Sequence, residues 1–131
     1  MGPSSNSVAE SSRASSSART NLRESAVPHL YIHIPFCLQV CPYCSFYKEI
    51  AGPGKADPLV DAVVREAELF GGRAAPETVF LGGGTPTALS VSQLTRLFAG
   101  LHQHIDLSKV REFTIEMNPA TVTAPKTDPL K

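Results

Sequence analysis

The sequence predicts an α/β fold in which parallel strands form one sheet and helices cover one of its faces. Two stretches place apolar residues at the spacing of a helix, and three shorter stretches have the composition and alternation of strands. From residue 28 onward these stretches follow one another as strand, long loop, helix, strand, helix and strand. This order is typical of repeated βαβ units, whose strands lie side by side and run parallel.

Length and charge limit the size and the partners of the protein. The chain of 131 residues is long enough for one ordinary domain. Its 12 Lys and Arg residues balance 12 Asp and Glu residues, so the formal net charge is zero. A nucleic-acid partner is therefore not expected, because proteins that bind polyanions usually carry excess positive charge. No apolar run approaches the roughly 18 to 20 residues that a membrane span requires, so no span is expected.

Residues 1–27 are predicted to form a disordered, serine-rich tail. Nine of the first 25 residues are serine, and the segment has too few apolar residues to offset the entropy cost of ordering it. The alternative is a mitochondrial transit peptide, although Glu10 and Glu24 are unusual for such a signal. We therefore expect a cytoplasmic protein, or a mitochondrial one if the tail is a transit peptide. The core is expected over residues 28–123, with an irregular end over residues 124–131.

The first strand is predicted over His29–Pro35, where β-favouring residues alternate between two faces. One face carries Leu30, Ile32 and Ile34. The other face carries Tyr31 and His33, and we interpret His33 as a structural residue rather than a ligand.

The first helix is predicted to follow a long loop. Asp57 is a favourable N-cap, and Pro58 then occupies the first helical position. The apolar stripe of this helix consists of Leu59, Val63, Ala67 and Phe70. Gly71-Gly72 is expected to end the helix, because glycine readily adopts the left-handed backbone of a helix C-terminus.

The second strand is predicted over Glu77–Leu81 and leads directly into the glycine run Gly82–Gly84. The second helix follows, and Ser90 and Gln93 have the spacing of a capping box at its start. Its apolar stripe consists of Leu94, Leu97, Phe98, Leu101 and Ile105.

The third strand is predicted over Glu112–Asn118, with Glu116 on its polar face. Three unusual stretches then fall at comparable places: a cysteine-rich loop follows the first strand, the glycine run follows the second, and Glu116 closes the third. In parallel sheets, ligands gather beyond the carboxyl ends of the strands. The sequence therefore predicts one binding site at this edge.

All three cysteines of the chain, Cys37, Cys41 and Cys44, lie within eight residues. A disulfide framework is not expected from an odd number of cysteines at such close spacing. An iron–sulfur cluster is the favoured interpretation, because three thiolates on a four-iron cluster leave one iron open for chemistry. A zinc site is the alternative, with His33 as the fourth ligand.

Three motifs resemble the radical S-adenosylmethionine (SAM) superfamily. They are YIHIPFCLQVCPYC at residues 31–44, GGGTP at residues 82–86 and IEMNP at residues 115–119. Within that superfamily the chain is similar to the coproporphyrinogen-dehydrogenase-like branch, which contains HemN and the haem chaperone HemW. The resemblance implies a partial (β/α)6 barrel, of which this β-loop-α-β-α-β pattern would be the N-terminal half.

The resemblance also implies two cofactors. Cys37, Cys41 and Cys44 would hold a [4Fe-4S] cluster, whose open iron chelates the amino and carboxylate groups of SAM. An electron from the cluster then splits SAM into methionine and a 5′-deoxyadenosyl radical, while the protein positions the cofactors. The residues that match the SAM contacts of the family are Tyr31, Tyr43, Gly83, Gly84, Thr85 and Glu116.

One departure within the branch favours a HemW-like protein. HemN-type enzymes carry a fourth cysteine two residues after the array, whereas here Ser45 and Phe46 follow Cys44. The resemblance then implies haem handling, with haem or another tetrapyrrole and an electron-donor protein as partners. The alternatives are a HemN-type oxygen-independent coproporphyrinogen III oxidase and a non-catalytic zinc or iron–sulfur module. Whether the protein is an enzyme depends on which of these applies.

Only three strands of the six-strand core are expected in this sequence. We therefore expect a truncated chain that carries part of the SAM site, with an open edge at its third strand. Such a chain is expected to hold a cluster without turning SAM over efficiently.

Overall fold

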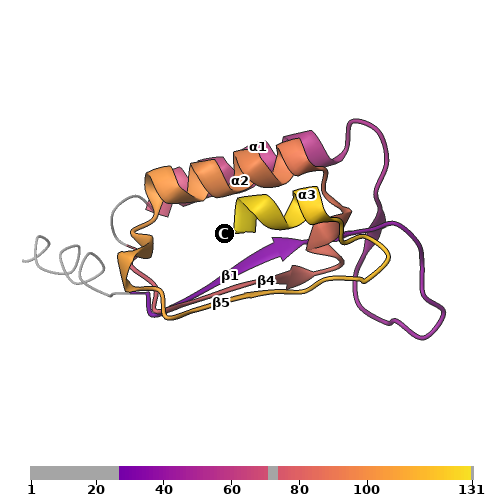
Figure 1. Ribbon diagram of the computed structural model, residues 1–131, viewed down its shortest axis with the longest axis horizontal. Helices are drawn as coiled ribbons and strands as arrows, with labels where there is room; N and C mark the ends of the chain where they lie inside the picture. The colour runs from indigo at the N-terminus through magenta and orange to yellow at the C-terminus, as the bar shows by residue number, and fades with distance from the viewer. Residues whose placement is uncertain (1–26, 71–73, 131) are drawn as a thin grey trace, which may run out of the picture.

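The computed structural model describes residues 27–70 and 74–130. The predicted tail, apart from residue 27, and the predicted helix stop at Gly71-Gly72 lie outside the described residues. Figure 1 shows a sheet with helices stacked over one of its faces. The main elements are β1 (His29–Ile34), α1 (Ala56–Phe70), β4 (Thr78–Gly83), α2 (Val91–His104) and β5 (Glu112–Ile115).

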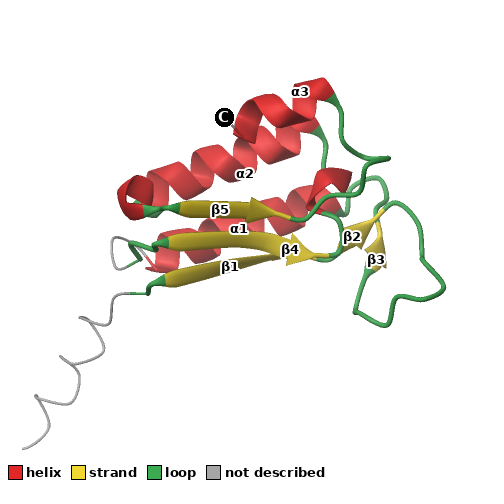
Figure 2. Ribbon diagram, turned by 60° about the horizontal axis from the view of Figure 1, so that its bottom comes forward, coloured by secondary structure: helices red, strands yellow, loops and turns green. Residues whose placement is uncertain are grey.

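The three long strands form one parallel sheet in the order β1–β4–β5, which confirms the predicted fold class. The register places Tyr31 opposite Phe80, and Phe80 opposite Thr114. All three strands point toward the end of the sheet where β2 (Phe36–Cys37), β3 (Glu49–Ile50) and the loop between them lie (Figure 2). The carboxyl ends of the strands therefore converge on this loop.

The core lies between the sheet and the two long helices. Alternate strand positions face the helices, because successive side chains of a strand point to opposite faces. The sheet and the helices contribute the buried residues Ile32, Ile34, Val79, Leu81, Val60, Leu94, Leu97 and Leu101. Burying each such side chain contributes roughly 1.5 to 3 kcal/mol, so this layer provides the main stabilisation of the fold.

The two long helices differ in how closely they follow their predicted starts. Helix α1 begins at Ala56, one residue before the predicted N-cap Asp57. Pro58 still lies in the first turn, where its missing N–H removes no helical hydrogen bond. Helix α2 has the predicted capping box: Gln93 N donates to Ser90 Oγ, and Ser90 N donates to the Gln93 side chain.

Each of the three strands ends at another position than predicted. Strand β1 ends at Ile34, one residue before the predicted end at Pro35. Strand β4 continues past Leu81 to Gly83, because its last residues still pair with β1 as far as Ile34. Strand β5 ends at Ile115, so Glu116 follows the strand instead of lying within it. The backbone nevertheless stays paired there, since Glu116 N donates to Leu81 O at 2.9 Å.

The end of the described chain is helical where an irregular segment is predicted. A short helix, α3 (Ala124–Thr127), is followed by a 3-10 turn, η4 (Asp128–Leu130). The irregular end is expected from its two prolines, which break a helix when they lie in its interior. Pro125, however, lies in the first turn of α3, where proline is tolerated. Figure 1 shows α3 beside α2, on the same face of the sheet.

Short turns connect the main elements. The 3-10 turn η2 (Pro86–Ala88) leads from β4 to α2, and η3 (Leu107–Lys109) leads from α2 to β5.

Arg96 of α2 forms ion pairs with Asp57 and Asp61 of α1. These pairs are exposed, so each contributes little to stability. Among the described residues, no helix has the length and apolar character that a membrane crossing requires.

Candidate functional site

The three unusual stretches of the sequence meet at the carboxyl ends of the strands (Figure 2). The cysteine loop continues from β1 through β2, the glycine run ends β4, and Glu116 follows β5. The chain returns after Glu116 toward the same loop, because Asn118 and Thr121 line a small cavity together with Cys37 and Cys41. The topology thus brings together segments that are far apart in the sequence.

The three cysteines lie in one loop and are all free thiols of intermediate exposure. Cys37 is the last residue of β2, and Cys44 N donates to Cys41 O at 3.1 Å in a turn between the other two. Within residues 27–70 and 74–130, no three His, Cys, Asp or Glu side chains are grouped closely enough to hold a metal ion. The structure therefore does not gather the three thiols, or His33, into a finished ligand set.

Polar contacts hold the second half of the cysteine loop. Lys48 Nζ donates to Cys44 O at 2.6 Å and to Phe46 O at 3.2 Å. The pKa of Tyr43 is raised above its ordinary value, first by a hydrogen bond with Cys41 and then by the negative charge of that cysteine. Desolvation and the charge of Cys44 raise this pKa further. Tyr43 thus lies within the cysteine loop and interacts with the thiol of Cys41.

The glycine run comes close to the backbone of the first strand and its extension. Gly83 has a φ of +115°, and a Cβ built there would lie 2.5 Å from His33 Nδ1. A Cβ on Gly84 would lie 2.7 Å from Phe36 O. No side chain fits at either position without displacing a neighbour. Glycine is therefore required at the end of β4 by close packing against the first strand, and the N–H groups of Gly83 and Gly84 donate to Glu116 Oε2 and Ile34 O.

Thr85 joins the glycine run to the cysteine loop. Its backbone N–H donates to Phe36 O at 2.7 Å, and its Oγ1 donates to Cys37 Sγ at 3.5 Å. A cavity of about 130 Å³ opens beside this junction. It is lined by Cys37, Leu38, Gln39, Cys41, Thr85, Asn118, Ala120 and Thr121.

Glu116 faces the glycine run from the third strand. Its Oε2 accepts a hydrogen bond from Gly83 N at 3.1 Å. The same carboxylate would lie 2.9 Å from a Cβ built on Gly82. A carboxylate and the bare backbone of β4 are therefore in direct contact, as their positions on neighbouring strand ends predict.

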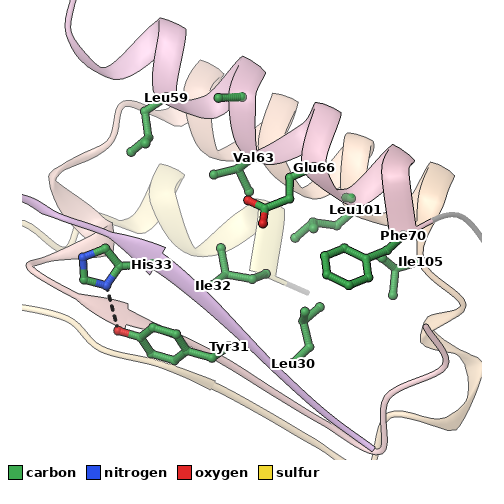
Figure 3. A pocket seen from close by; sticks show the side chains of 12 residues that line it. Leu30, Tyr31, Ile32, His33, Leu59, Val63, Glu66, Phe70, Leu101 and Ile105 are labelled. Carbon is green, nitrogen blue, oxygen red and sulfur yellow. Dashed lines mark hydrogen bonds between the residues drawn. The ribbon is translucent and has the colours of Figure 1, made fainter. Parts of the chain in front are cut away.

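The face of the sheet away from the helices carries aromatic side chains. Tyr31 is 56% exposed, its ring stacks on Phe80 at a centroid distance of 5.9 Å, and its hydroxyl bonds His33 Nδ1 at 3.0 Å (Figure 3). The sequence predicts a structural role for His33. In the structure this residue connects Tyr31 to the glycine run, because its ring packs against Gly83.

A larger, mostly apolar pocket of about 450 Å³ lies between β1 and α1. Figure 3 shows Glu66 of α1 pointing into it between Val63 and Leu101. The thiols and Glu116 are not among the residues that line this pocket. We therefore assign the candidate site to the strand ends, where Cys37, Cys41 and Thr85 line the smaller cavity.

Sequence reasoning missed Lys126. Its Nζ donates to Thr87 O at 2.7 Å and to Thr121 O at 3.1 Å, and so holds α3 against the loop that follows the glycine run. No motif surrounds Lys126 in the sequence. A contact between residues 39 positions apart has no local signal that could have revealed it.

Comparison with known proteins identifies relatives of this chain. The sequence profile of the Radical SAM superfamily matches residues 31–131. Heme chaperone HemW of Lactococcus lactis subsp. lactis is 37% identical over 71% of this chain and 24% of its own length. HemW of Bacillus subtilis is 37% identical over 77% of this chain and 28% of its own length. Oxygen-independent coproporphyrinogen III oxidase of Escherichia coli is 36% identical over 78% of this chain and 23% of its own length.

A solved structure has the same fold over most of the chain. It is coproporphyrinogen III oxidase (HemN) of Escherichia coli, which is described as a radical SAM enzyme. The TM-score is 0.67 at 35% identity, over 79% of this chain and 25% of that one. This chain thus spans about a quarter of the length of the proteins that it matches. The profile match and the fold together show that the chain belongs to the radical SAM superfamily.

Proposed function

We propose that this chain is the cluster- and SAM-binding part of a HemW-like protein that handles haem. The observation that carries this proposal is the junction between the cysteine loop and the glycine run, where Thr85 contacts Cys37. The 37% identity to two HemW heme chaperones supports the haem-related role. Phe46 supports it further, because it stands where HemN-type enzymes have a cysteine.

The donor chemistry of the loop fits an iron–sulfur cluster. Cys37, Cys41 and Cys44 are three free thiols in one short loop, and thiolates are the ligands that such clusters take. A bound [4Fe-4S] cluster supplies an electron to SAM at its open iron. In this proposal the three cysteines hold the cluster. Lys48 stabilises the loop conformation through its hydrogen bonds to the carbonyl oxygens of Cys44 and Phe46.

The polar groups next to the thiols fit SAM. The resemblance assigns Gly83 and Gly84 to the amino and carboxylate groups of SAM, and neither residue has a side chain that would cover the end of β4. As the resemblance implies, Glu116 offers a carboxylate for the ribose hydroxyl groups of SAM. Thr85, directly after the glycine run, is a further SAM contact. Tyr31 and Tyr43 add aromatic surface beside the site.

Anaerobic reconstitution with iron and sulfide tests the cluster assignment. Cys37→Ala, Cys41→Ala and Cys44→Ala are each expected to abolish the broad brown absorbance and the EPR signal of the reduced cluster, since each removes one thiolate ligand. Ser45→Ala, in the same loop, is the control and should keep both signals. Full iron content in each single cysteine variant would show that the ligands are wrong. One equivalent of bound zinc without iron would instead support a zinc module.

Oxidation of coproporphyrinogen III is the second candidate function, because the chain shares its fold with HemN. The cluster-loaded chain can be assayed for haem binding by difference spectroscopy and for coproporphyrinogen consumption by chromatography. Haem binding without consumption supports the HemW-like role. Consumption of coproporphyrinogen would support the oxidase and contradict the proposal.

A further inference from the structure

We propose that Lys126 is a positioning residue that holds Thr85 against the sulfur of Cys37 and thereby tunes the cluster. This inference rests on the proposed function, because it concerns a sulfur that would ligate iron. It goes beyond that function, since Lys126 lies outside the three motifs and touches none of the candidate ligands directly.

The first step is a buried polar clamp between the loop after β4 and the turn after β5. Thr87 and Thr121 are 1% and 5% exposed, and their hydroxyl groups share a hydrogen bond. Thr121 Oγ1 is also bonded to Asn118 O at 2.8 Å. Burying polar groups costs free energy unless they are paired, so the two segments are held in one relative position.

Lys126 closes this clamp from α3. Its ammonium group donates to the carbonyl oxygens of Thr87 and Thr121, one from each segment. Hydrogen bonds from a charged donor are about twice as strong as neutral ones. Lys126 is part-buried, which shields both bonds from competing water. It therefore holds the turn η2, to which Thr87 belongs, against the segment that contains Thr121.

The clamp is connected to the thiol through that turn. Ala88 N donates to Thr85 O at 2.8 Å, so Thr85 and Thr87 belong to one hydrogen-bonded turn. Thr85 in turn donates to Cys37 Sγ. The Thr85 hydroxyl points at Cys37 Sγ only while the turn of residues 85–88 keeps its conformation. Lys126 is thus linked to the sulfur by two short steps, through Thr87 and Thr85.

The effect on a bound cluster follows from electrostatics. The positive end of the Thr85 hydroxyl dipole lies toward Cys37 Sγ and favours the reduced cluster, which carries more negative charge. Hydrogen bonds to the sulfurs are among the factors that set cluster potentials. Removing this hydrogen bond should make the reduction potential more negative. Removing Lys126 should have the same effect, because Thr85 is then no longer held in place.

The experiment compares six forms of the full chain: wild type, Thr85→Val, Lys126→Met, Lys126→Arg, the Thr85→Val/Lys126→Met double variant and the control Lys109→Met. Lys109 is an exposed lysine at the end of η3. EPR-monitored redox titration should give a more negative potential for Thr85→Val and Lys126→Met. Lys126→Arg should restore much of the wild-type value, and Lys109→Met should not change it. A Thr85→Val/Lys126→Met double variant should match Thr85→Val alone, because both changes act through one hydrogen bond.

Hydrogen exchange of the cluster-free chain tests the positioning step separately. The amide groups of Gly84, Thr85 and Ala88 should exchange at least about tenfold faster in Lys126→Met than in Lys109→Met, because a charge-assisted hydrogen bond is lost. Unchanged exchange there, or an unchanged potential in either Thr85→Val or Lys126→Met, would overturn the inference. A wild-type chain that takes up no iron would contradict the proposed function instead, and the exchange data would still decide whether Lys126 holds the turn.

Discussion

Gly83 lies where the backbone of β4 turns against the imidazole ring of His33. Its φ of +115° is in the region that only glycine adopts easily, and a Cβ there would be 2.5 Å from His33 Nδ1. The same imidazole nitrogen is bonded to the hydroxyl of Tyr31. A side chain at this position would therefore strain the backbone and also displace the residue that orients Tyr31.

Gly83→Ala is expected to lower the free energy of unfolding more than Gly54→Ala does. Both glycines have positive φ, so alanine costs roughly 1 to 2 kcal/mol of backbone strain at either position. A Cβ on Gly54 would meet no atom within 4 Å, whereas one on Gly83 is blocked by His33 and should cost about 1 to 3 kcal/mol more. Urea denaturation measures both losses. Equal losses would mean that the His33 contact relaxes without cost.

The contacts of single residues were predictable only where they are local. The run Gly82–Gly84 directly after an apolar strand indicates bare backbone from composition alone. The hydrogen bond from Thr85 to Cys37 joins residues 48 positions apart, and that from Lys126 to Thr87 joins residues 39 apart. Such pairs depend on how the loops pack, and no periodicity or spacing encodes them.

At the scale of elements, helices α1 and α2 approach each other closely at Gly100. A Cβ on Gly100 would lie 2.5 Å from Val64 Cγ2 and 2.6 Å from its Cγ1. Valine is branched at Cβ and has little rotamer freedom in a helix. The glycine therefore allows a close helix contact, although it is a poor helix former.

Gly100→Ala should consequently destabilise the protein, although the same change in an exposed helix stabilises by about 1 kcal/mol. Overpacking against Val64 costs roughly 1 to 3 kcal/mol, which exceeds the gain in helix propensity. Val64→Ala in the same chain should relieve the clash, so the double variant is expected to be more stable than the sum of the two single changes predicts. Thermal or urea unfolding of the four forms measures this coupling. Additive effects would show that the helices separate freely.

Helices and strands, like single contacts, were predictable where their signals are local in the sequence. The capping box of Ser90 and Gln93 was predictable because its two partners are three residues apart. The two-residue pairing of β2 with β3 was not, since Phe36–Cys37 and Glu49–Ile50 have no strand pattern of their own. Helix α3 is not expected from the sequence because proline usually breaks a helix, whereas Pro125 lies in the first turn, where it is compatible with one.

For the molecule as a whole, the two faces of the sheet differ sharply. Helices cover one face, as Figure 1 shows, and the other carries exposed aromatic side chains such as Tyr31 and Phe80. Parallel sheets usually have both faces covered. The βαβ order was sufficient to predict the parallel sheet and the convergence of the cysteine loop, the glycine run and Glu116, because topology alone determines which strand ends are neighbours.

This one-sided architecture leads to the last prediction, that the cluster-loaded chain of 131 residues turns SAM over slowly. The residues proposed to contact SAM would approach it only from the strand ends and the cysteine loop; they are Tyr31, Tyr43, Gly83, Gly84, Thr85 and Glu116. A charge-assisted hydrogen bond between protein and ligand contributes roughly 1.5 to 3 kcal/mol to the binding free energy. Where SAM bonds water instead of protein, this contribution is lost. The loss of two or three such bonds weakens binding by several powers of ten. Anaerobic incubation with dithionite and SAM, followed by chromatography of 5′-deoxyadenosine, measures turnover against Escherichia coli HemN as the reference. Repeated turnover at a comparable rate would show that contacts from three strands are sufficient.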